Sequence, residues 1–474
     1  MIVALSRCAG ASFTDPGWQP APSPGISLFQ CQAIDRMAAI DGTDRLLRAL
    51  SIGRLGAWPG WSRNNNPGKR MTMERELQAG VMTGISLLLP ITLATMAVVL
   101  LAPVLPRLMV EYAQVPGHDY LVPMVLTLPA LCVALLCPLA GLLGDRFGRR
   151  RLLLFAFLLY AAVGMAPLVL IDLRAILVSR VGVGIAEALI YVLSTTMISD
   201  HFTGAARDRW LAWQTAFASQ SALLFFALGG LLGGFGWRVP FWVYGSALVM
   251  FVLVWRYTSE HPANVSGQQP DQAPQPMTAP TKVRFAFIVA ITVVAAVLFY
   301  TVQIQGSVGL THLGLTSPAR IGVLTALASL GVPLGTLVYA RVAGQGPARL
   351  LCAEFAMLAV GFLLMGYSRG VSMFLAGSFI NQLGGGMLLP TLLVWAINLL
   401  PYQVRARGTG LWQSSFALGQ WLSTLAVTTL SLRFGGLMAT FALLGYVALA
   451  CMGIAAVALL LFRRRRPDGA FAAC

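Results

Sequence analysis

The chain has 474 residues, of which 57% are hydrophobic and only 11% are charged, and its mean hydropathy is +0.75. These values exclude an ordinary soluble protein and indicate one that crosses a membrane several times. The formal charge of +16 would suit a nucleic-acid-binding protein. The cations, however, gather in the connections between apolar runs, so we expect a lipid bilayer and no nucleic acid as partner.

The N-terminal segment at residues 1–72 is rich in Pro, Gly, Ser, Asn and Arg and contains no apolar run long enough to span a bilayer. Such a composition predicts a disordered extension. Met71 and Met73 are alternative starts of translation, so whether residues 1–72 are translated stays open.

Twelve apolar runs come after this segment, each about 20 residues or longer, which is enough to cross roughly 30 Å of hydrocarbon. We predict an all-α integral membrane protein with an N-terminal bundle at 73–256, a cytoplasmic linker at 257–284, a C-terminal bundle at 285–462 and a basic tail at 463–474. The expected spans of the first bundle are 81–106, 121–143, 152–171, 174–199, 210–234 and 238–256. Those of the second are 285–306, 321–341, 349–367, 371–399, 409–431 and 437–462.

The orientation follows from the basic residues. The even-numbered connections and the C-terminal tail carry far more Lys and Arg than the odd-numbered connections. Because cytoplasmic segments are enriched in Lys and Arg, both termini are expected inside the cell, in a plasma (inner) membrane.

The two sets of six runs suggest a duplication. An Arg-x-Arg pair followed by Trp-Gln at residues 207–214 recurs at 405–413. Two halves related in this way predict a binding site between them near the middle of the membrane.

A compact charged turn, Gly141–Arg151, separates the second and third runs and reads GLLGDRFGRRR. Its glycines let helix ends approach, and its carboxylate and guanidiniums are natural partners. The residues that carry the pattern are Gly141, Asp145, Arg146, Gly148, Arg149 and Arg150.

This turn resembles the loop signature of the major facilitator superfamily (MFS) of secondary transporters, between transmembrane helices 2 and 3. The resemblance implies the MFS fold, with twelve transmembrane helices in two six-helix bundles related by a pseudo-twofold axis, and transport by alternating access. We expect the turn to act as a conformational latch, in which Asp145 and the arginines pair in the outward-open state and separate when the bundles rock inward.

Two ionisable residues, Arg180 and Glu187, lie inside the fourth run. Their spacing of nearly two turns places them on one helix face, about 10 Å apart along the axis. Because a charge inside a bilayer costs several kcal/mol, we predict a proton or charge relay. A buried pair that only locks helix packing is the alternative. The segment Arg180-x-x-x-Gly184 resembles the family's fourth-helix pattern, which is associated with proton coupling, whereas the role of Glu187 is inferred from its position alone.

Uncharged polar and aromatic residues on several runs are candidates for the substrate cavity. Interhelical hydrogen bonding explains them equally well. Gln303 and Gln305 point about 200° apart on a helix, so only one of them can face a cavity squarely. The candidates are Tyr191, Gln220, Gln303, Gln305, Asn381, Gln382 and Trp395.

For function, we expect proton-coupled export of drug-like compounds by a monomer, with the proton gradient as energy source and with no cofactor, metal or enzymatic activity. The glycines at 229–234 partly resemble the signature of bacterial drug/proton antiporters, with Gly230 in place of proline. A cavity with few acids would suit neutral or anionic cargo, with Arg180 as counter-ion. Uptake of a small metabolite or organic acid is the alternative, and a non-transporting receptor or assembly factor is an alternative of another class.

Overall fold

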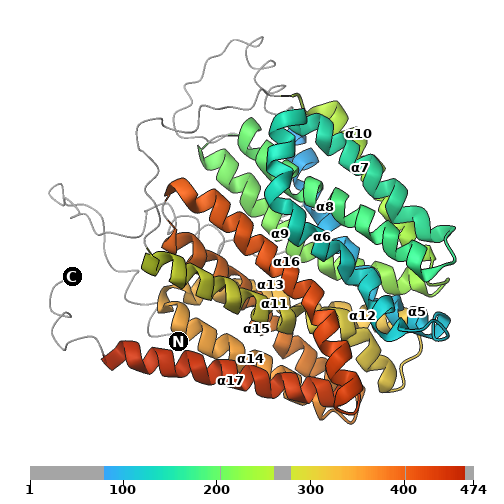
Figure 1. The fold of residues 1–474 in the computed structure, drawn as a ribbon, viewed down its shortest axis with the longest axis vertical. Coiled ribbons are helices and arrows are strands. Elements are labelled where there is room, and N and C mark those ends of the chain that lie inside the picture. The colour runs from blue at the N-terminus through green and yellow to red at the C-terminus, as the bar shows by residue number, and fades with distance from the viewer. Residues whose placement is uncertain (1–79, 203, 261–278, 401, 465–474) are drawn as a thin grey trace, which may run out of the picture. The chain divides into compact units, whose positions relative to one another are not determined.

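A computed structural model describes residues 80–202, 204–260, 279–400 and 402–464 (Figure 1). Every regular element within these ranges is a helix. The predicted N-terminal extension lies outside the described residues, as do residues 261–278 of the predicted linker and most of the basic tail.

The first membrane span is broken into short pieces. Residues 80–88 are helical, and a turn at Pro90 separates them from the next helical piece. Proline removes a backbone donor and clashes with the preceding turn, which explains the breaks. The later pieces are α4 (Ile91–Val99), the 3-10 turn η1 (Ala102–Val104) and α5 (Leu105–Glu111).

The remaining spans of the first half are more regular. They are α6 (His118–Phe147), α7 (Arg149–Met165) with η2 (Ala166–Leu168), α8 (Leu173–His201), α9 (Gly204–Gly233), and η3 (Val239–Gly245) with α10 (Ser246–Tyr257).

The second half repeats this order of six spans, with the second of them interrupted at Leu330. They are α11 (Ala279–His312), α12 (Pro318–Ser329) with α13 (Gly331–Val342) and η5 (Ala343–Gln345), α14 (Pro347–Gly366), α15 (Val371–Leu399), α16 (Tyr402–Arg433) and α17 (Leu437–Arg464).

Many helix boundaries differ from the sequence prediction by a few residues, and two of these differences change the predicted organisation. The charged turn is reduced to one residue, because α6 runs to Phe147 and α7 begins at Arg149, with Gly148 at φ +90° between them. Hydropathy marks where the apolar run ends, but the helix continues past it, since charged side chains pair along its surface. Likewise, α11 begins at Ala279, within the segment predicted as linker up to residue 284.

Eleven helical segments of the described chain are long and apolar enough to cross a membrane. The remaining span, α16, has the length but carries more polar side chains, among them Gln413, Ser414, Ser415 and Gln420. Three of these four are buried, and Gln413 is half-buried. Because α16 packs against α6 and α11, its polar residues face protein rather than lipid.

The pseudo-twofold relation is visible in which helices touch. In the first half α6 packs on α8, α7 on α8, α4 on α9, and α10 on α7. The corresponding pairs of the second half, α13 on α15, α14 on α15, α11 on α16, and α17 on α14, are also in contact. Figure 1 shows the blue-to-green helices of the first half gathered beside the yellow-to-red helices of the second. The halves therefore share one internal packing scheme.

The two halves meet through α6 with α16 and α9 with α12, pairs that the same symmetry interchanges. The hydroxyl groups of Tyr120 and Thr429 lie 3.3 Å apart, and Thr428 Oγ1 donates to the Asp119 carbonyl at 3.3 Å. These contacts lie beside the odd-numbered connections, at the beginning of α6 and the end of α16.

Glycine residues make the contact between α9 and α12 possible. A Cβ atom placed on Gly230 of α9 would lie 2.6 Å from the Cα atom of Gly322 and 2.6 Å from the Pro318 carbonyl oxygen on α12. Backbones this close leave no room for a side chain. The glycine that stands where the resembling signature has proline is thus a packing residue between the halves.

We predict that Gly230→Ala lowers the midpoint of thermal unfolding in detergent, because overpacking a tight contact costs about 1–3 kcal/mol. Gly306→Ala on α11 is the matched control, since a Cβ there meets nothing within 4 Å. Equal midpoints for Gly230→Ala and the unmodified protein would contradict the close approach.

Candidate functional site: a cavity between the two halves

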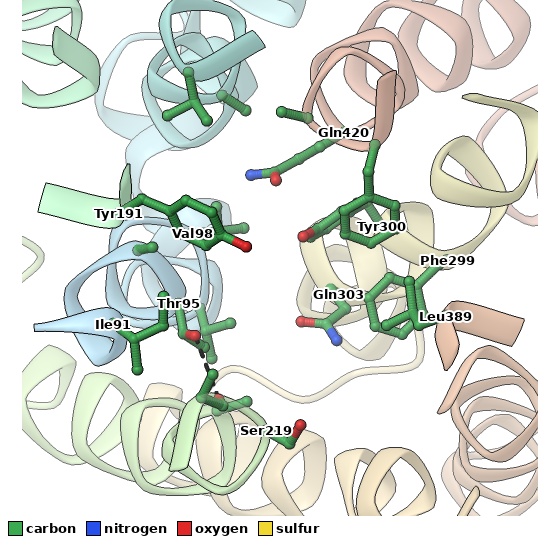
Figure 2. Close-up of a pocket in the computed structure, with 18 of the residues that line it drawn as sticks. Ile91, Thr95, Val98, Tyr191, Ser219, Phe299, Tyr300, Gln303, Leu389 and Gln420 are labelled. Carbon is green, nitrogen blue, oxygen red and sulfur yellow. Dashed lines mark hydrogen bonds between the residues drawn. The ribbon is translucent and has the colours of Figure 1, made fainter. Parts of the chain in front are cut away.

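A cavity of about 210 Å³ lies between the halves and is lined by helices of both (Figure 2). Its first-half wall comes from α4, α6, α8 and α9, and its second-half wall from α11, α13, α15 and α16. The polar and aromatic residues of the lining are Thr95, Glu187, Tyr191, Ser219, Phe299, Tyr300, Gln303, Gln413, Phe416 and Gln420.

The first-half wall is shaped by helix periodicity. Glu187 and Tyr191 are four residues apart on α8, so their side chains leave the same face of the helix. On α4, Thr95 Oγ1 donates to the Ala218 carbonyl of α9 at 3.3 Å, which ties two lining helices together. Figure 2 shows the hydroxyl groups of Tyr191 and Tyr300 pointing toward each other from opposite walls.

The second-half wall is aromatic. The Tyr300 ring centroid lies 5.1 Å from that of Phe299 and 5.2 Å from that of Phe416. Trp412 stacks on Phe416 at 5.8 Å with an interplanar angle of 5°. Aromatic clusters of this kind are rigid and present both ring faces and edges to a ligand.

Glu187 is the charged residue of this cavity. Of the lining residues, all within the described ranges, it alone carries a formal charge. Its side chain is 7% exposed, and its Oε2 atom has no hydrogen-bond partner. Because Glu187 is at the midpoint of α8, it lies about 21 Å from either end of the helix. The carboxylate is therefore near mid-depth and open to a proton or a ligand.

Arg180 does not line the cavity, although the sequence places it on the same helix face as Glu187. Its side chain is fully buried, and its Nη2 atom donates to the carbonyl oxygens of Val163 at 3.1 Å and Gly164 at 3.0 Å. In a regular helix the Val163 carbonyl would accept from the N–H of residue 167, but that residue is Pro167 and has none. The guanidinium supplies the missing donor.

Aromatic rings complete the surroundings of this arginine. The Arg180 Cζ atom lies 5.2 Å from the ring centroid of Phe241 and 5.0 Å from that of Tyr244, both in η3. Arg180 and Glu187 form no salt bridge with each other. The geometry therefore favours a packing role for Arg180, joining α7, α8 and η3, and removes it as counter-ion of the cavity.

The other candidates divide between the cavity and the helix interfaces. Tyr191 and Gln303 line the cavity, and Gln303 Nε2 donates to Gln382 Oε1 at 3.1 Å, so Gln382 stands behind it. Gln305 and Asn381 are buried outside the lining, and Asn381 Nδ2 donates to a carbonyl of α14 at 3.4 Å. The remaining two candidates, Gln220 and Trp395, also lie outside the lining. Gln220 is exposed, and the ring of Trp395 packs edge-on against that of Phe287, with the centroids 6.4 Å apart.

The sequence prediction did not include several residues of the site. Gln413 is the glutamine of the second Trp-Gln pair, so the repeat was a usable signal for it, whereas Thr95, Ser219 and Tyr300 have no sequence signal beyond polarity in an apolar run. A second buried acid, Glu354 on α14, was also missed. Its Oε1 accepts a hydrogen bond from Thr391 Oγ1 at 2.5 Å, away from the cavity.

The charged turn forms a network within the first half. Gly141, Asp145 and Arg146 belong to the end of α6, and Arg149 and Arg150 open α7. The Arg149 guanidinium binds Asp145 at 2.7 Å and Asp200 of α8 at 2.6 Å, and Arg150 Nη2 donates to the Trp255 carbonyl at 2.7 Å. In this conformation the network joins α6, α7, α8 and α10. The latch predicts that Asp145 and the arginines separate when the bundles rock inward; the Asp145–Arg149 pair is present in this conformation, and a change of pairing between conformations stays a prediction.

We predict that Arg180→Met lowers the stability of the folded protein, because it leaves the Val163 carbonyl buried without a donor at a cost of about 1–3 kcal/mol. The check is thermal unfolding in detergent together with ligand binding. Unchanged stability combined with loss of proton-driven flux would instead support the relay.

Two six-helix halves, related by a shared packing scheme and enclosing a cavity between them, define a two-bundle membrane transporter. The sequence profile of the Major Facilitator Superfamily matches residues 87–368, which is more than half of the chain, and the chain belongs to this family.

Among characterised relatives, the tetracycline resistance protein, class G, of Vibrio anguillarum is 33% identical over 161 residues, covering 32% of this chain and 39% of that protein. The drug efflux pump JefA of Mycobacterium tuberculosis (strain CDC 1551 / Oshkosh) is 30% identical over 161 residues, covering 33% of this chain and 29% of the pump. The chain thus matches well under half of the length of either relative.

Solved structures show the same fold at low identity. A bacterial homolog of the human lysosomal transporter Spinster, inward-facing and unoccupied, superposes with a TM-score of 0.68 at 14% identity, over 83% of this chain and 99% of that one. A D-xylose–proton symporter gives a TM-score of 0.64 at 14% identity, over 78% and 97% of the two chains.

Proposed function

We propose that this transporter exports small amphiphilic compounds in exchange for protons, by alternating access. The observation that carries the proposal is the cavity shared by both halves, with one unpartnered carboxylate at mid-depth. A buried carboxylate surrounded by membrane is stable only when a proton or a counter-ion neutralises it. Binding and release of that proton can therefore be tied to the state of the cavity.

Export rather than uptake is supported by the relatives, one named a tetracycline resistance protein and the other a drug efflux pump. The likeness to these proteins is partial, so the direction belongs to the proposal. The fold alone does not favour export over uptake, since the same fold is found in a D-xylose–proton symporter.

The side of loading follows from where the halves touch. If the basic, even-numbered connections and both termini are cytoplasmic, in an inner membrane, the hydrogen bonds of Tyr120 and Thr428 lie on the outer side. Contact there fits an inward-facing conformation, in which cargo enters from the cytoplasm. Rocking would break these contacts and open the cavity outward.

The test is a set of proteoliposomes that hold a pH-sensitive dye and are given an outward-directed or inward-directed proton gradient. We predict that a panel of toxic compounds, including tetracycline, contains cargo whose addition drives proton movement. Glu187→Gln abolishes this coupling, because an amide binds no proton in this range. Glu354→Gln is the matched control, a buried acid outside the cavity, and keeps the coupling.

Three outcomes would contradict the proposal. Coupled flux that survives in Glu187→Gln removes the carboxylate from the mechanism. Proton movement in the same direction as the cargo indicates uptake of a metabolite. Absence of flux for every compound, with growth on the same panel unaffected by expression, indicates a receptor or an assembly factor.

A separate prediction concerns the latch. Asp145→Asn weakens the pair with Arg149, and an exposed pair contributes about 0.2–1 kcal/mol. We expect the maximal transport rate to fall by up to about fivefold while the affinity for cargo is unchanged, because the turn is remote from the cavity.

The matched control for the latch is Asp172→Asn, the same exchange at the beginning of α8. The Asp172 carboxylate accepts from the backbone N–H of Ala175 as a helix cap, and asparagine caps equally well. A normal transport rate for Asp145→Asn would refute the latch.

A further inference from the structure

The two walls of the cavity differ in kind. Glu187 provides the formal charge of the lining and comes from the first half, whereas the aromatic rings of Phe299, Tyr300 and Phe416 come from the second half. We infer that the cargo is a small amphiphilic organic cation, whose charged group binds at Glu187 and whose apolar ring packs on the aromatic wall. The inference rests on the proposed function and names the substrate class of the same cavity.

The sign of the charge follows from what the cavity lacks. Of the arginines in the described ranges, the fully buried one is Arg180 of α8, which is enclosed by two carbonyl groups and two rings and does not reach the lining. An anionic cargo would meet an unpaired carboxylate with no cation to offset it. A cationic cargo supplies the counter-ion that Glu187 Oε2 does not have in the described structure.

The aromatic wall supports the same sign of charge. A cation is attracted to the face of an aromatic ring within about 6 Å, and groups of such rings recognise quaternary ammonium ligands. The ring of Tyr300 contacts that of Phe416 at an interplanar angle of 51°, and Trp412, which is outside the lining, stacks on Phe416. Neutral side chains on either side, Gln303 and Gln420, can orient polar groups without adding charge.

Size limits the cargo as well. The cavity volume of about 210 Å³ is below the range of about 300–1,000 Å³ that is typical of sites for drug-sized ligands. A compact cation with few rings fits the described conformation, whereas a larger compound requires the walls to separate.

One carboxylate cannot be neutralised by a proton and by a cationic cargo at once. Cargo binding therefore displaces the proton, and this competition is itself an exchange mechanism.

The titratable groups that interact electrostatically with Glu187 are neutral thiols and phenols: Cys132 and Cys137 of α6, Tyr160 of α7, Tyr244 of η3 and Tyr300 of α11. Tyr191 lies on α8 itself, and α4 and the lining part of α9 add no acid or base. Glu187 is thus the group that sets the pH dependence of cargo binding.

The test is equilibrium binding to the purified full-length protein in detergent, with radiolabelled 1-methyl-4-phenylpyridinium as cation and biphenyl-4-carboxylate as an anion of similar shape. We expect the unmodified protein to bind the cation at least about tenfold more tightly than the anion. Glu187→Gln should lower the affinity for the cation about tenfold or more and remove the preference, while Glu187→Asp retains it.

The matched control is again Glu354→Gln, which should leave the preference unchanged, because that acid is bound to Thr391 outside the cavity. Proton release on adding the cation, measured in weakly buffered solution, should be detectable for the unmodified protein and absent for Glu187→Gln. The affinity for the cation should fall as the pH is lowered, because the proton then occupies the carboxylate.

Several results would overturn the inference: equal affinity for cation and anion, tighter binding of the anion, or full cation affinity in a correctly folded Glu187→Gln. If that variant fails to fold, the Glu187→Asp protein and the proton-release measurement decide the question. Binding of the cation through Glu187 without proton-driven flux of any compound would refute the proposed function and leave the inference intact. Proton-driven flux of anions would support the proposed function and refute the inference that the cargo is a cation.

Discussion

The requirement that buried polar groups be satisfied governs this structure more than any other constraint, because neither lipid nor a packed helix interface offers water. Arg180 and Glu187 illustrate its two outcomes on one helix. The arginine fills a gap in the backbone hydrogen bonds of α7, left where Pro167 has no N–H, and rings cover its guanidinium. The carboxylate has an oxygen without a partner and faces a cavity. The arginine donates through Nη2 and holds helices together, although its Nη1 atom has no hydrogen-bond partner, whereas the carboxylate faces a cavity in which a ligand or a proton can bind.

The sequence was sufficient for the class and for most of the architecture. Apolar runs, the positive-inside bias and the Gly-Asp-Arg turn predict two six-helix halves of the major facilitator type, and the family match and the fold confirm this. Helix ends were harder, as Gly148 shows, because hydropathy follows the bilayer whereas a helix continues wherever its side chains can pair. The cavity was predicted only in part, since the face of a helix that is occupied by a partner depends on packing. Gln303 and Gln305 are both buried, yet only Gln303 reaches the lining.

The duplication also shows why the repeat motif indicates the site in only one of its two copies. Trp213 and Trp412 occupy corresponding positions of the two repeats, but Trp213 is 47% exposed, whereas Trp412 is 6% exposed and stacks on Phe416. Their neighbours diverge as well: Gln214 is buried and receives a hydrogen bond from Thr195, whereas Gln413 lines the cavity. Corresponding positions of the two halves thus keep their place in the fold and lose their common role.

Because the two halves diverge in this way, the two walls of the cavity differ in charge. A symmetric pair of bundles with identical walls would present either two charges or none, and two like charges would repel each other across a narrow space. Here α8 contributes Glu187, while α15, which holds the equivalent place in the second half, contributes the apolar Leu389. One half therefore carries the carboxylate, together with Tyr191, and the other carries the cluster of Phe299, Tyr300 and Phe416. The proposed proton exchange requires a titratable carboxylate in only one of the two halves, which this asymmetric cavity provides.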